Sequence, residues 1–386
     1  MSLMYAAILT DTKQMTPDLL LGSRYTLGTV IGSGKHGVVY KARDTQADAQ
    51  VAVKVNNCVG AKRFSLEREV EILRTLHNRP GIAGLLAVRS RAGGMAIVME
   101  LYGSSLEGLL ACCGGLFTLK TVVSCAFQMF GALRVVHEAG FVHRDVTPAN
   151  FVIRRDRPGQ LHLVDFGVAE QVTPAEPTPK APATGVAGSP MFAPANAFTR
   201  VQGYPKDDLE SCALVLVFCM QGRLPWYKVT GSTEEKINQR LYEAKRRVTT
   251  NALCSGLSPE LCSIFKHLEA REITQHPDYQ SVQQLLVDLC TRKHLVMDGV
   301  MDWSALVEAD PEVGVGCSMP TAMVTRSQGN LGRPMPTDHS EESSEKSPEI
   351  PARGNRVLQA MRSGSDMAKR ALQQLPTTRP RTAVSS

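Results

Sequence analysis

The sequence predicts an α+β fold with a small, β-rich N-terminal lobe and a larger, mainly helical C-terminal lobe. Short β-branched runs separated by turn residues fill the first hundred residues, whereas apolar residues recur at helical spacing from residue 105 onward. With 386 residues and 43% apolar composition, the chain can bury a substantial core. The change of pattern near residues 100–103 predicts a hinge between the two lobes.

The N-terminal lobe is expected to contain five strands and one helix. Three strands are predicted in "YTLGTVIGSG", "HGVVYKAR" and "QVAVKVNN". A helix follows in "RFSLEREVEILRTL", where Phe64, Val70, Leu73 and Leu76 recur at helical spacing. Two further strands are expected at 84–88 and in "MAIVMEL".

The C-terminal lobe is expected to be built from helices. The first two are predicted at 105–112 and 119–139, the second of which ends at a glycine suited to a C-cap. Later helices are expected at 207–221, 233–247, 259–270 and 279–292. Between Val172 and Gly185 the chain is rich in Pro and Thr, which predicts an exposed loop.

Composition and charge narrow the class of protein. The net charge is only +6, and 10 of the 43 basic residues lie after residue 317, so we expect no nucleic-acid partner. The start of the chain lacks a basic n-region, and the longest apolar run, "ALVLVFCM", is far shorter than the roughly 20 residues of a membrane span. The ten cysteines are dispersed without CxxC pairs. These features predict an intracellular protein of the cytoplasm, the nucleus or both, without a transmembrane segment.

Segments outside the two lobes are also predicted. Residues 1–23 form an N-terminal extension, 296–317 a short C-terminal extension, and 318–386 a basic, Ser- and Pro-rich disordered tail. Within the tail, 355–375 has an imperfect apolar stripe, which indicates a transient helix or, alternatively, a helix that docks a partner or lipid. Thr-Pro pairs at 173–174 and 178–179 and Ser-Pro at 347–348 are candidate phosphorylation sites, or else plain solvated residues.

The stretch "GSGKHG" at 32–37 is a candidate phosphate-binding turn. Glycines at this spacing let backbone N–H groups approach phosphate oxygens without a side-chain clash. An ordinary hairpin turn is the alternative. A Rossmann fingerprint is excluded, because the following "VVYKAR" is strand-like and not helical.

The stretch "VAVK" places Lys54 on the next strand, with Val51 and Val53 on the opposite face. A buried lysine requires an anion, which Glu69 on the following helix can supply. A lone strand lysine is usually a solvated edge residue. A glycine turn, a lysine strand and a glutamate helix in this order are a much rarer combination.

The stretch "HRDVTPAN" at 143–150 puts charged and amide side chains between two apolar runs. Asp145 can orient an acceptor hydroxyl, and Asn150 can offer an amide oxygen to a metal ion. Fifteen residues later, "VDFG" offers Asp165 as a second metal ligand. Cations, a carboxylate and a cover that excludes water are the groups that γ-phosphoryl transfer needs.

Taken together, these motifs resemble those of eukaryotic protein kinases. Within that family the chain is most similar to the casein kinase 1 group, as shown by "VMELYGSSLEGLL" (98–110), "DDLESCALVLVF" (207–218) and "GRLPW". The segment "GSPMFAPAN" lacks an "APE", and Asn196 stands where other groups have glutamate. The resemblance covers about residues 24–295, with lobes at 24–100 and 104–295, and implies a bilobal protein-kinase fold.

The resemblance also implies an activity and its residues. It implies an ATP- and Mg²⁺-dependent serine/threonine kinase that acts on protein substrates with Ser or Thr acceptors. Asp145 is then the catalytic base, Lys54 holds the α- and β-phosphates while paired with Glu69, and Asn150 and Asp165 bind Mg²⁺. His143 and Phe166 belong to an internal spine, and Asp208 braces the catalytic loop. Residues implied to cover the phosphates are Gly32, Ser33, Gly34, Lys35, His36, Gly37, Val38 and Val39, and those implied to surround the adenine are Ala52, Met99, Glu100 and Tyr102.

Two positions depart from the group. Thr147 replaces the lysine that touches the γ-phosphate, so the alternative reading is a pseudokinase that binds nucleotide or partners with little turnover. Met191 replaces a basic residue that binds a phosphate already on the substrate, although Arg200 and Lys206 are near in sequence. Ser189 keeps the hydroxyl position typical of Ser/Thr kinases. A third interpretation is a small-molecule kinase, which the glycine turn and "DDLES" both disfavour.

Overall fold

The structure is a computed structural model that describes residues 21–34, 37–56, 61–91, 94–172 and 178–310. Several predictions therefore lie outside the described residues. They concern Lys35 and His36, the Thr173-Pro174 pair, the extension before residue 21, and the whole segment 311–386 with its tail helix and Ser347-Pro348.

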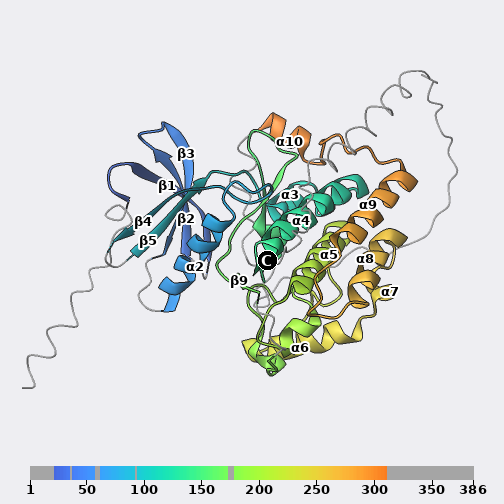
Figure 1. Ribbon diagram of the computed structural model, residues 1–386. Helices are drawn as coiled ribbons and strands as arrows, with labels where there is room; N and C mark the ends of the chain where they lie inside the picture. Colours follow the sequence, from blue (N-terminus) through green and yellow to red (C-terminus); the bar gives the residue numbers. More distant parts are fainter. Residues whose placement is uncertain (1–20, 35–36, 57–60, 92–93, 173–177, 311–386) are drawn as a thin grey trace, which may run out of the picture. The chain divides into compact units, whose positions relative to one another are not determined.

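The N-terminal lobe is a five-stranded antiparallel sheet in the order β1-β2-β3-β5-β4, with helix α2 beside it (Figure 1). Its elements are β1 (Tyr25–Gly34), β2 (Gly37–Asp44), β3 (Ala49–Asn56), α2 (Ala61–Thr75), β4 (Leu85–Arg91) and β5 (Gly94–Glu100). Every element predicted for this lobe is present. Together with the helical part described next, the sheet confirms the predicted α+β fold.

The two faces of β3 have different environments. Val51, Val53 and Val55 are buried in a small cluster with Tyr25 and Val98. Alternation along a strand sends Lys54 to the opposite face, toward α2. This face carries the candidate site.

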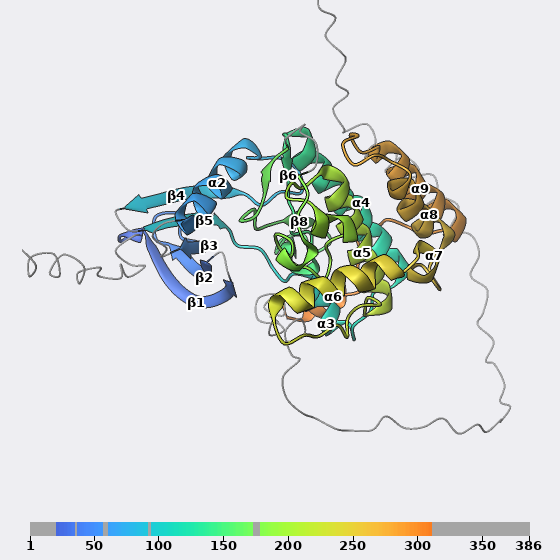
Figure 2. The same ribbon diagram turned by 90° about the horizontal axis from the view of Figure 1, so that it is seen from below.

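The C-terminal lobe is mainly helical (Figures 1 and 2). Its larger helices are α3 (Leu106–Cys112), α4 (Leu119–Glu138), α5 (Pro205–Gln221), α6 (Glu234–Arg247), α8 (Pro259–Glu269) and α9 (Tyr279–Lys293). All six were predicted to within two residues at each end. The sequence analysis did not predict α7 (Thr250–Leu253) or α10 (Ser304–Ala309), since one turn of helix is too short to show a period.

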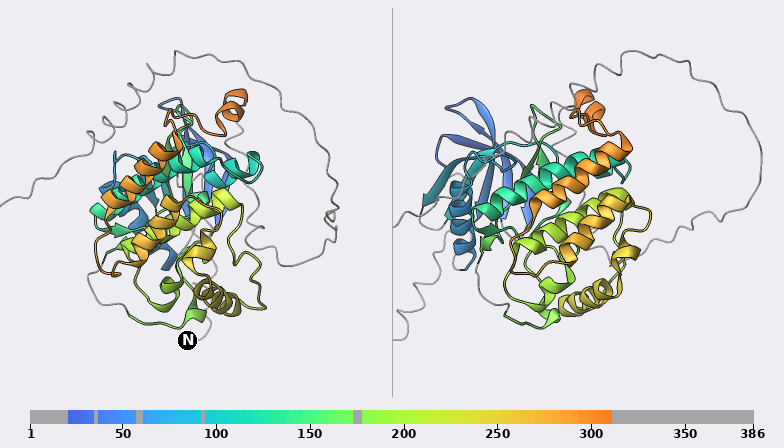
Figure 3. Two further views of the ribbon diagram at one scale, coloured as in Figure 1. Left: turned by 90° about the vertical axis from the view of Figure 1, so that its right-hand side faces the viewer. Right: turned by 45° about the vertical axis from the view of Figure 1, so that its right-hand side comes forward.

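Helix α4 is the central helix of this lobe. It packs against α5 and α9, and Figure 3 shows α4 and α9 running side by side. Among the described residues, only α4 has the length and apolar composition of a membrane span. Most of it is buried within the fold, as in many core helices, so it gives only weak support for a membrane span.

Two short two-stranded antiparallel sheets lie in the C-terminal lobe. Strand β6 (Phe141–Val142) pairs with β9 (Glu170–Gln171), and β7 (Phe151–Ile153) pairs with β8 (Leu161–Leu163). Of these two sheets, only β7–β8 is a hairpin. A 3₁₀ turn at Pro148–Asn150 leads into β7. In the predicted Pro-rich loop, a second 3₁₀ turn spans Pro182–Thr184 and begins at a proline, where the missing N–H costs nothing.

Residues 295–310, after α9, pack back onto the C-terminal lobe. Trp303 is fully buried against Phe117, with ring centroids 5.1 Å apart, and its Nε1 donates to the Pro158 carbonyl at 2.9 Å. Asp302 accepts the Thr118 N–H at 2.6 Å and the Thr118 hydroxyl at 2.8 Å. This segment, which was predicted as an extension, contributes to the hydrophobic core of the helical lobe.

Candidate active site

Lys54, Glu69 and Asp165 meet at the boundary of the two lobes. Lys54 Nζ lies 2.8 and 2.7 Å from the two carboxylate oxygens of Glu69 and 2.8 Å from Asp165 Oδ1. Burial by itself lowers the pKa of Lys54, but the two carboxylates raise it above its ordinary value. The ammonium is therefore charged at neutral pH, and the predicted Lys54–Glu69 pair is present.

The β7–β8 hairpin brings Asn150 and Asp165 to the same end of the strands. Asn150 directly precedes β7, Asp165 follows β8 by two residues, and the Val164 N–H donates to the Asn150 carbonyl at 2.9 Å. Asp165 has a φ of +60°, an uncommon value for a residue with a side chain. Its Oδ1 accepts the Gly167 N–H at 3.1 Å, which stabilises this sharp turn.

Asp145 is held by donors on both of its carboxylate oxygens. The Ser189 N–H donates to Oδ1 at 2.8 Å, and Asn150 Nδ2 donates to Oδ2 at 2.9 Å. Burial raises the pKa of Asp145, against the opposing effects of His143 and of these two donors. The carboxylate is thus fixed in orientation. The contact from Ser189 runs through its backbone N–H, whereas the sequence analysis had emphasised its hydroxyl.

The loop that carries Asp145 is held from below by Asp208 of α5. The carboxylate of Asp208 accepts the N–H groups of His143 at 2.7 Å and Arg144 at 2.8 Å, and lies 2.8 Å from His137 Nε2. Burial raises the pKa of Asp208, but these partners outweigh it and lower the pKa overall. The bracing predicted for Asp208 is therefore present.

His143 and Phe166 also contact each other as predicted. Both are fully buried, and their rings meet edge to face with centroids 5.0 Å apart. His143 Nε2 lies 3.2 Å from the Val164 carbonyl. The catalytic loop and the turn after β8 are thereby packed as one unit.

Asn150 and Asp165 have the chemistry of a Mg²⁺ site. Asn150 Nδ2 is engaged by the carbonyl and the carboxylate of Asp145, which leaves Oδ1 as the atom available to a cation. About a third of the Asp165 side chain is exposed. Carboxylate and amide oxygens are ligands that Mg²⁺ prefers, so these two residues fit the ion.

The residues implied to surround a nucleotide lie along β1, β2, β3 and β5. Gly32 and Ser33 face Val39 and Val38 across the first hairpin, and Gly34 faces Gly37 at its described end. Val39 in turn faces Lys54, Ala52 faces Met99, and β5 ends at Glu100, just before Tyr102. The register thus lines up these residues on neighbouring strands next to the Lys54 pair.

Thr147 lies in the catalytic loop between Asp145 and Asn150. Its side chain is buried and does not cap the following 3₁₀ turn, while its carbonyl accepts the Asn150 N–H at 3.1 Å. The threonine thus has a backbone role in placing Asn150. No positive charge stands at this position.

The sequence analysis missed two residues beside the site. Gly188 has a φ of +73°, and a Cβ there would lie 2.6 Å from Asp145 Oδ1. Glu170 pairs with Arg144 Nη1 and also accepts the Gly203 N–H at 2.9 Å. The glycine before Ser189 and the acidic residue after "DFGVA" are visible in the sequence, but only the fold brings them to the loop.

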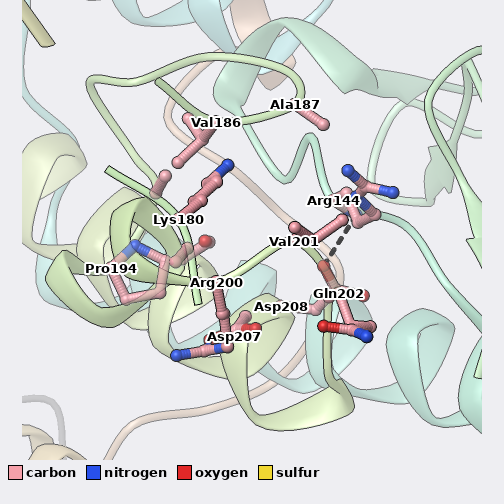
Figure 4. Close-up of a pocket in the computed structure, with 14 residues that line it drawn as sticks. Arg144, Lys180, Val186, Ala187, Pro194, Arg200, Val201, Gln202, Asp207 and Asp208 are labelled. Carbon is pink, nitrogen blue, oxygen red and sulfur yellow. Dashed lines mark hydrogen bonds and ion pairs between the residues drawn. The ribbon is translucent and has the colours of Figure 1, made fainter. Parts of the chain in front are cut away.

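A pocket beside the catalytic loop is bordered by three cationic residues, Arg144, Lys180 and Arg200 (Figure 4). Arg144 pairs with Glu170, and the buried Arg200 pairs with Asp207. Lys206 is also buried and donates to the Arg271 carbonyl at 2.7 Å. Arg200 and Lys206 thus both have partners inside the protein.

Comparison with models of known protein families gives a match. Residues 25–294 match the family model of the protein kinase domain, which is more than half of the chain. Members of this family generally use ATP and Mg²⁺. The match agrees with the two-lobed fold and with the grouping of Lys54, Glu69, Asp145, Asn150 and Asp165 described above, and the chain therefore belongs to the protein kinase family.

Proposed function

We propose that the chain is an active serine/threonine kinase that transfers the γ-phosphoryl group of ATP to protein substrates and belongs to the casein kinase 1 group. The single observation that carries the proposal is how the side chains of Lys54 and Asp145 are held. Lys54 is paired with both Glu69 and Asp165, while both oxygens of Asp145 are held by Ser189 and Asn150. Lys54 with its carboxylate partners, the candidate base and the two candidate metal ligands are thus grouped as phosphoryl transfer requires, while Thr147 stands where the lysine for the γ-phosphate would be.

Each residue has a defined task in this proposal. Lys54 binds oxygens of the α- and β-phosphates, and Glu69 keeps its ammonium in position. Asp145 orients the substrate hydroxyl and accepts its proton, while Asn150 and Asp165 hold Mg²⁺. Bound Mg²⁺ and ATP supply the phosphoryl group and the charge that neutralises its oxygens. The turn from Gly32 to Val39 covers the phosphates and excludes water.

Assignment to the casein kinase 1 group rests on two segments. The hinge "VMELYGSS" and the start of α5, "DDLES", are similar to that group. The segment "GSPMFAPAN" (188–196) is held by a lysine of α6. The buried Lys245 donates to the carbonyls of Met191 and Ala193, both at 2.8 Å, and lies over the ring of Trp226.

The rival function is a pseudokinase, motivated by Thr147. A charged donor to the transferring phosphoryl group is worth on the order of 100-fold in rate, so its loss slows transfer but leaves the base and the metal ligands intact. Tyrosine kinases also lack this lysine. A slower enzyme is therefore the better supported function.

The test is transfer of radiolabelled phosphate from ATP to casein and myelin basic protein, followed by identification of the labelled amino acid. We expect label on serine or threonine with the native chain, and none with Lys54→Met. Equal incorporation by both proteins would show that the label comes from elsewhere and would favour the pseudokinase. Label on aminoglycosides or choline, with proteins untouched, would instead identify a small-molecule kinase.

A further inference from the structure

The side chain of Tyr102 ties the hinge to the N-terminal lobe. Its hydroxyl donates to Glu100 Oε2 at 2.8 Å and accepts the Gly84 N–H at 3.0 Å. The Glu100 N–H in turn donates to the Gly84 carbonyl at 3.1 Å. Three hydrogen bonds thus close a ring through the end of β5, the hinge and the residue before β4.

Gly84 makes room for this ring. A Cβ on Gly84 would lie 2.9 Å from the carboxyl carbon of Glu100 and 3.1 Å from its Oε1. A side chain there would push the carboxylate away from the Tyr102 hydroxyl. The absence of a side chain at residue 84 is therefore a condition for the Glu100–Tyr102 bond.

The ring of Tyr102 also contacts the C-terminal lobe. It lies over His162 of β8, with centroids 5.0 Å apart and planes 32° apart. Burial, followed by the charge of Arg154, lowers the pKa of His162, so the imidazole is neutral against the tyrosine ring at neutral pH. The same strand bonds to the segment before β4, because Leu163 accepts the Ala83 N–H at 3.0 Å and donates to Gly81 at 2.8 Å.

Residues 81–84, the hinge and β8 therefore form one junction between the lobes. Next to Tyr102, the Gly103 N–H donates to the Ile153 carbonyl at 2.8 Å. The hinge backbone is thus fixed on the N-terminal side by the Tyr102 hydroxyl and on the C-terminal side by Gly103. Backbone that is fixed before a ligand arrives loses less entropy on binding.

We propose that Tyr102 is a positioning residue for the nucleotide. Its hydroxyl holds the backbone of residues 100–102 in the orientation that the adenine edge meets. The resemblance to the family assigned only backbone groups to this task. The proposal rests on the proposed function, namely that ATP binds at this hinge.

The test compares Tyr102→Phe with the native chain. Phenylalanine keeps the ring contact with His162 but removes both hydroxyl bonds. We expect KM for ATP and Kd for ADP to rise roughly three- to tenfold, the effect of losing one or two hydrogen bonds, with kcat within about twofold. The matched control is Tyr227→Phe, an exposed tyrosine after α5, which leaves both constants unchanged.

A second variant tests the same ring of hydrogen bonds at Gly84 instead of at Tyr102. Gly84→Ala displaces the Glu100 carboxylate but leaves Tyr102 intact, and it should raise KM for ATP in the same direction. Because both changes break one network, the double variant should have nearly the KM of the weaker-binding single variant, not the product of the two effects. Gly84→Ala also decides the question if Tyr102→Phe folds poorly.

The outcomes separate this inference from the proposed function. If the native chain binds no ATP or ADP, the proposed function fails, and with it the positioning role of Tyr102. If the native chain binds nucleotide and both variants bind it equally well, only the positioning role of Tyr102 is wrong. A fall in kcat with KM unchanged also contradicts it, because a displaced hinge acts on nucleotide binding and not on Asp145.

Discussion

The carboxylate of Asp145 depends on a neighbour that has no side chain. Gly188 lies against it, and a Cβ at that position would stand 2.6 Å from Oδ1 and 2.8 Å from the Asp145 Cβ. We expect Gly188→Ala to lower kcat by about 100-fold or more, since a misplacement of about 1 Å at a reacting group has that effect. Steady-state phosphorylation of casein measures it.

Gly256→Ala is the matched control for this prediction. Gly256 has a φ of +79°, so alanine there carries the same backbone strain of about 1–2 kcal/mol, but no atom lies within 4 Å of its Cβ. The control should keep its kcat while losing similar stability. Equal kcat in the two variants would mean that Gly188 does not position Asp145.

Glu210 in α5 has a raised pKa, which makes the free energy of unfolding depend on pH. Burial, then the nearby Asp207, raises the pKa of Glu210 to about 7, while Lys206 Nζ is 3.6 Å away and is bonded to Arg271. The folded protein keeps this proton up to about pH 7, whereas the unfolded chain loses it near pH 4.5. The free energy of unfolding therefore falls as pH rises through this range, by up to about 3 kcal/mol, and is level above it.

Glu210→Gln should remove this contribution. Above pH 7 the variant should be more stable than the native chain, and the difference should vanish toward pH 4.5. Urea unfolding of the full chain at several pH values measures it. A difference that does not depend on pH would show that Glu210 titrates normally.

At the scale of elements, strand β9 ties the catalytic loop to the segment before α5. Glu170 of β9 pairs with Arg144 and accepts the Gly203 N–H, and a Cβ on Gly203 would lie 2.8 Å from the Arg144 side chain. Glu170→Ala leaves a half-buried guanidinium and an N–H unpaired, at a cost of about 1–3 kcal/mol. We expect kcat to fall about tenfold while KM for ATP is unchanged.

Two comparisons make this result interpretable. Glu170→Gln keeps an acceptor for Gly203 and should fall between the native chain and Glu170→Ala. Glu138→Ala removes an exposed partner of Arg134 and should have no effect on rate. If Glu170→Ala transfers phosphate as fast as the native chain, β9 does not hold the catalytic loop.

Elements differ in how far the sequence predicts them. Strands β1 to β5 and seven helices, α2 among them, were predicted, because each carries a clear period of apolar residues bounded by turn residues. The pairing of Lys54 with Glu69 followed from the need of a buried cation for an anion. The positions of Glu170 and Gly188 did not follow, since they depend on two-residue strands and on a loop whose path is set by tertiary contacts.

At the scale of the whole molecule, the fold extends past the family match at residue 294. Met301, Trp303 and Val307 are buried in the main core, although they lie after that boundary. We expect Trp303→Ala to lower the free energy of unfolding by about 3–5 kcal/mol, the usual cost of removing a buried tryptophan side chain. The exposed Leu306 in the same segment gives the control, and Leu306→Ala should cost less than about 0.5 kcal/mol.

Truncation tests the same point. A chain that ends after residue 294 should unfold at a clearly lower temperature than one that ends after residue 310. Similar unfolding temperatures for the two truncated chains would show that the segment is dispensable. Its burial could not be predicted from the sequence, because a six-residue helix preceded by one tryptophan shows no period.

The claim that the whole molecule is a working kinase is tested most directly by the turnover of Asp145→Asn relative to the native chain, with ADP affinity measured on the same preparations. Asparagine fills the same space but cannot accept the proton of the substrate hydroxyl. We predict a loss in kcat of about 100-fold or more, with Kd for ADP within about threefold. Equal turnover by the two proteins, or no turnover by the native chain with bound Mg-ATP, would contradict the claim.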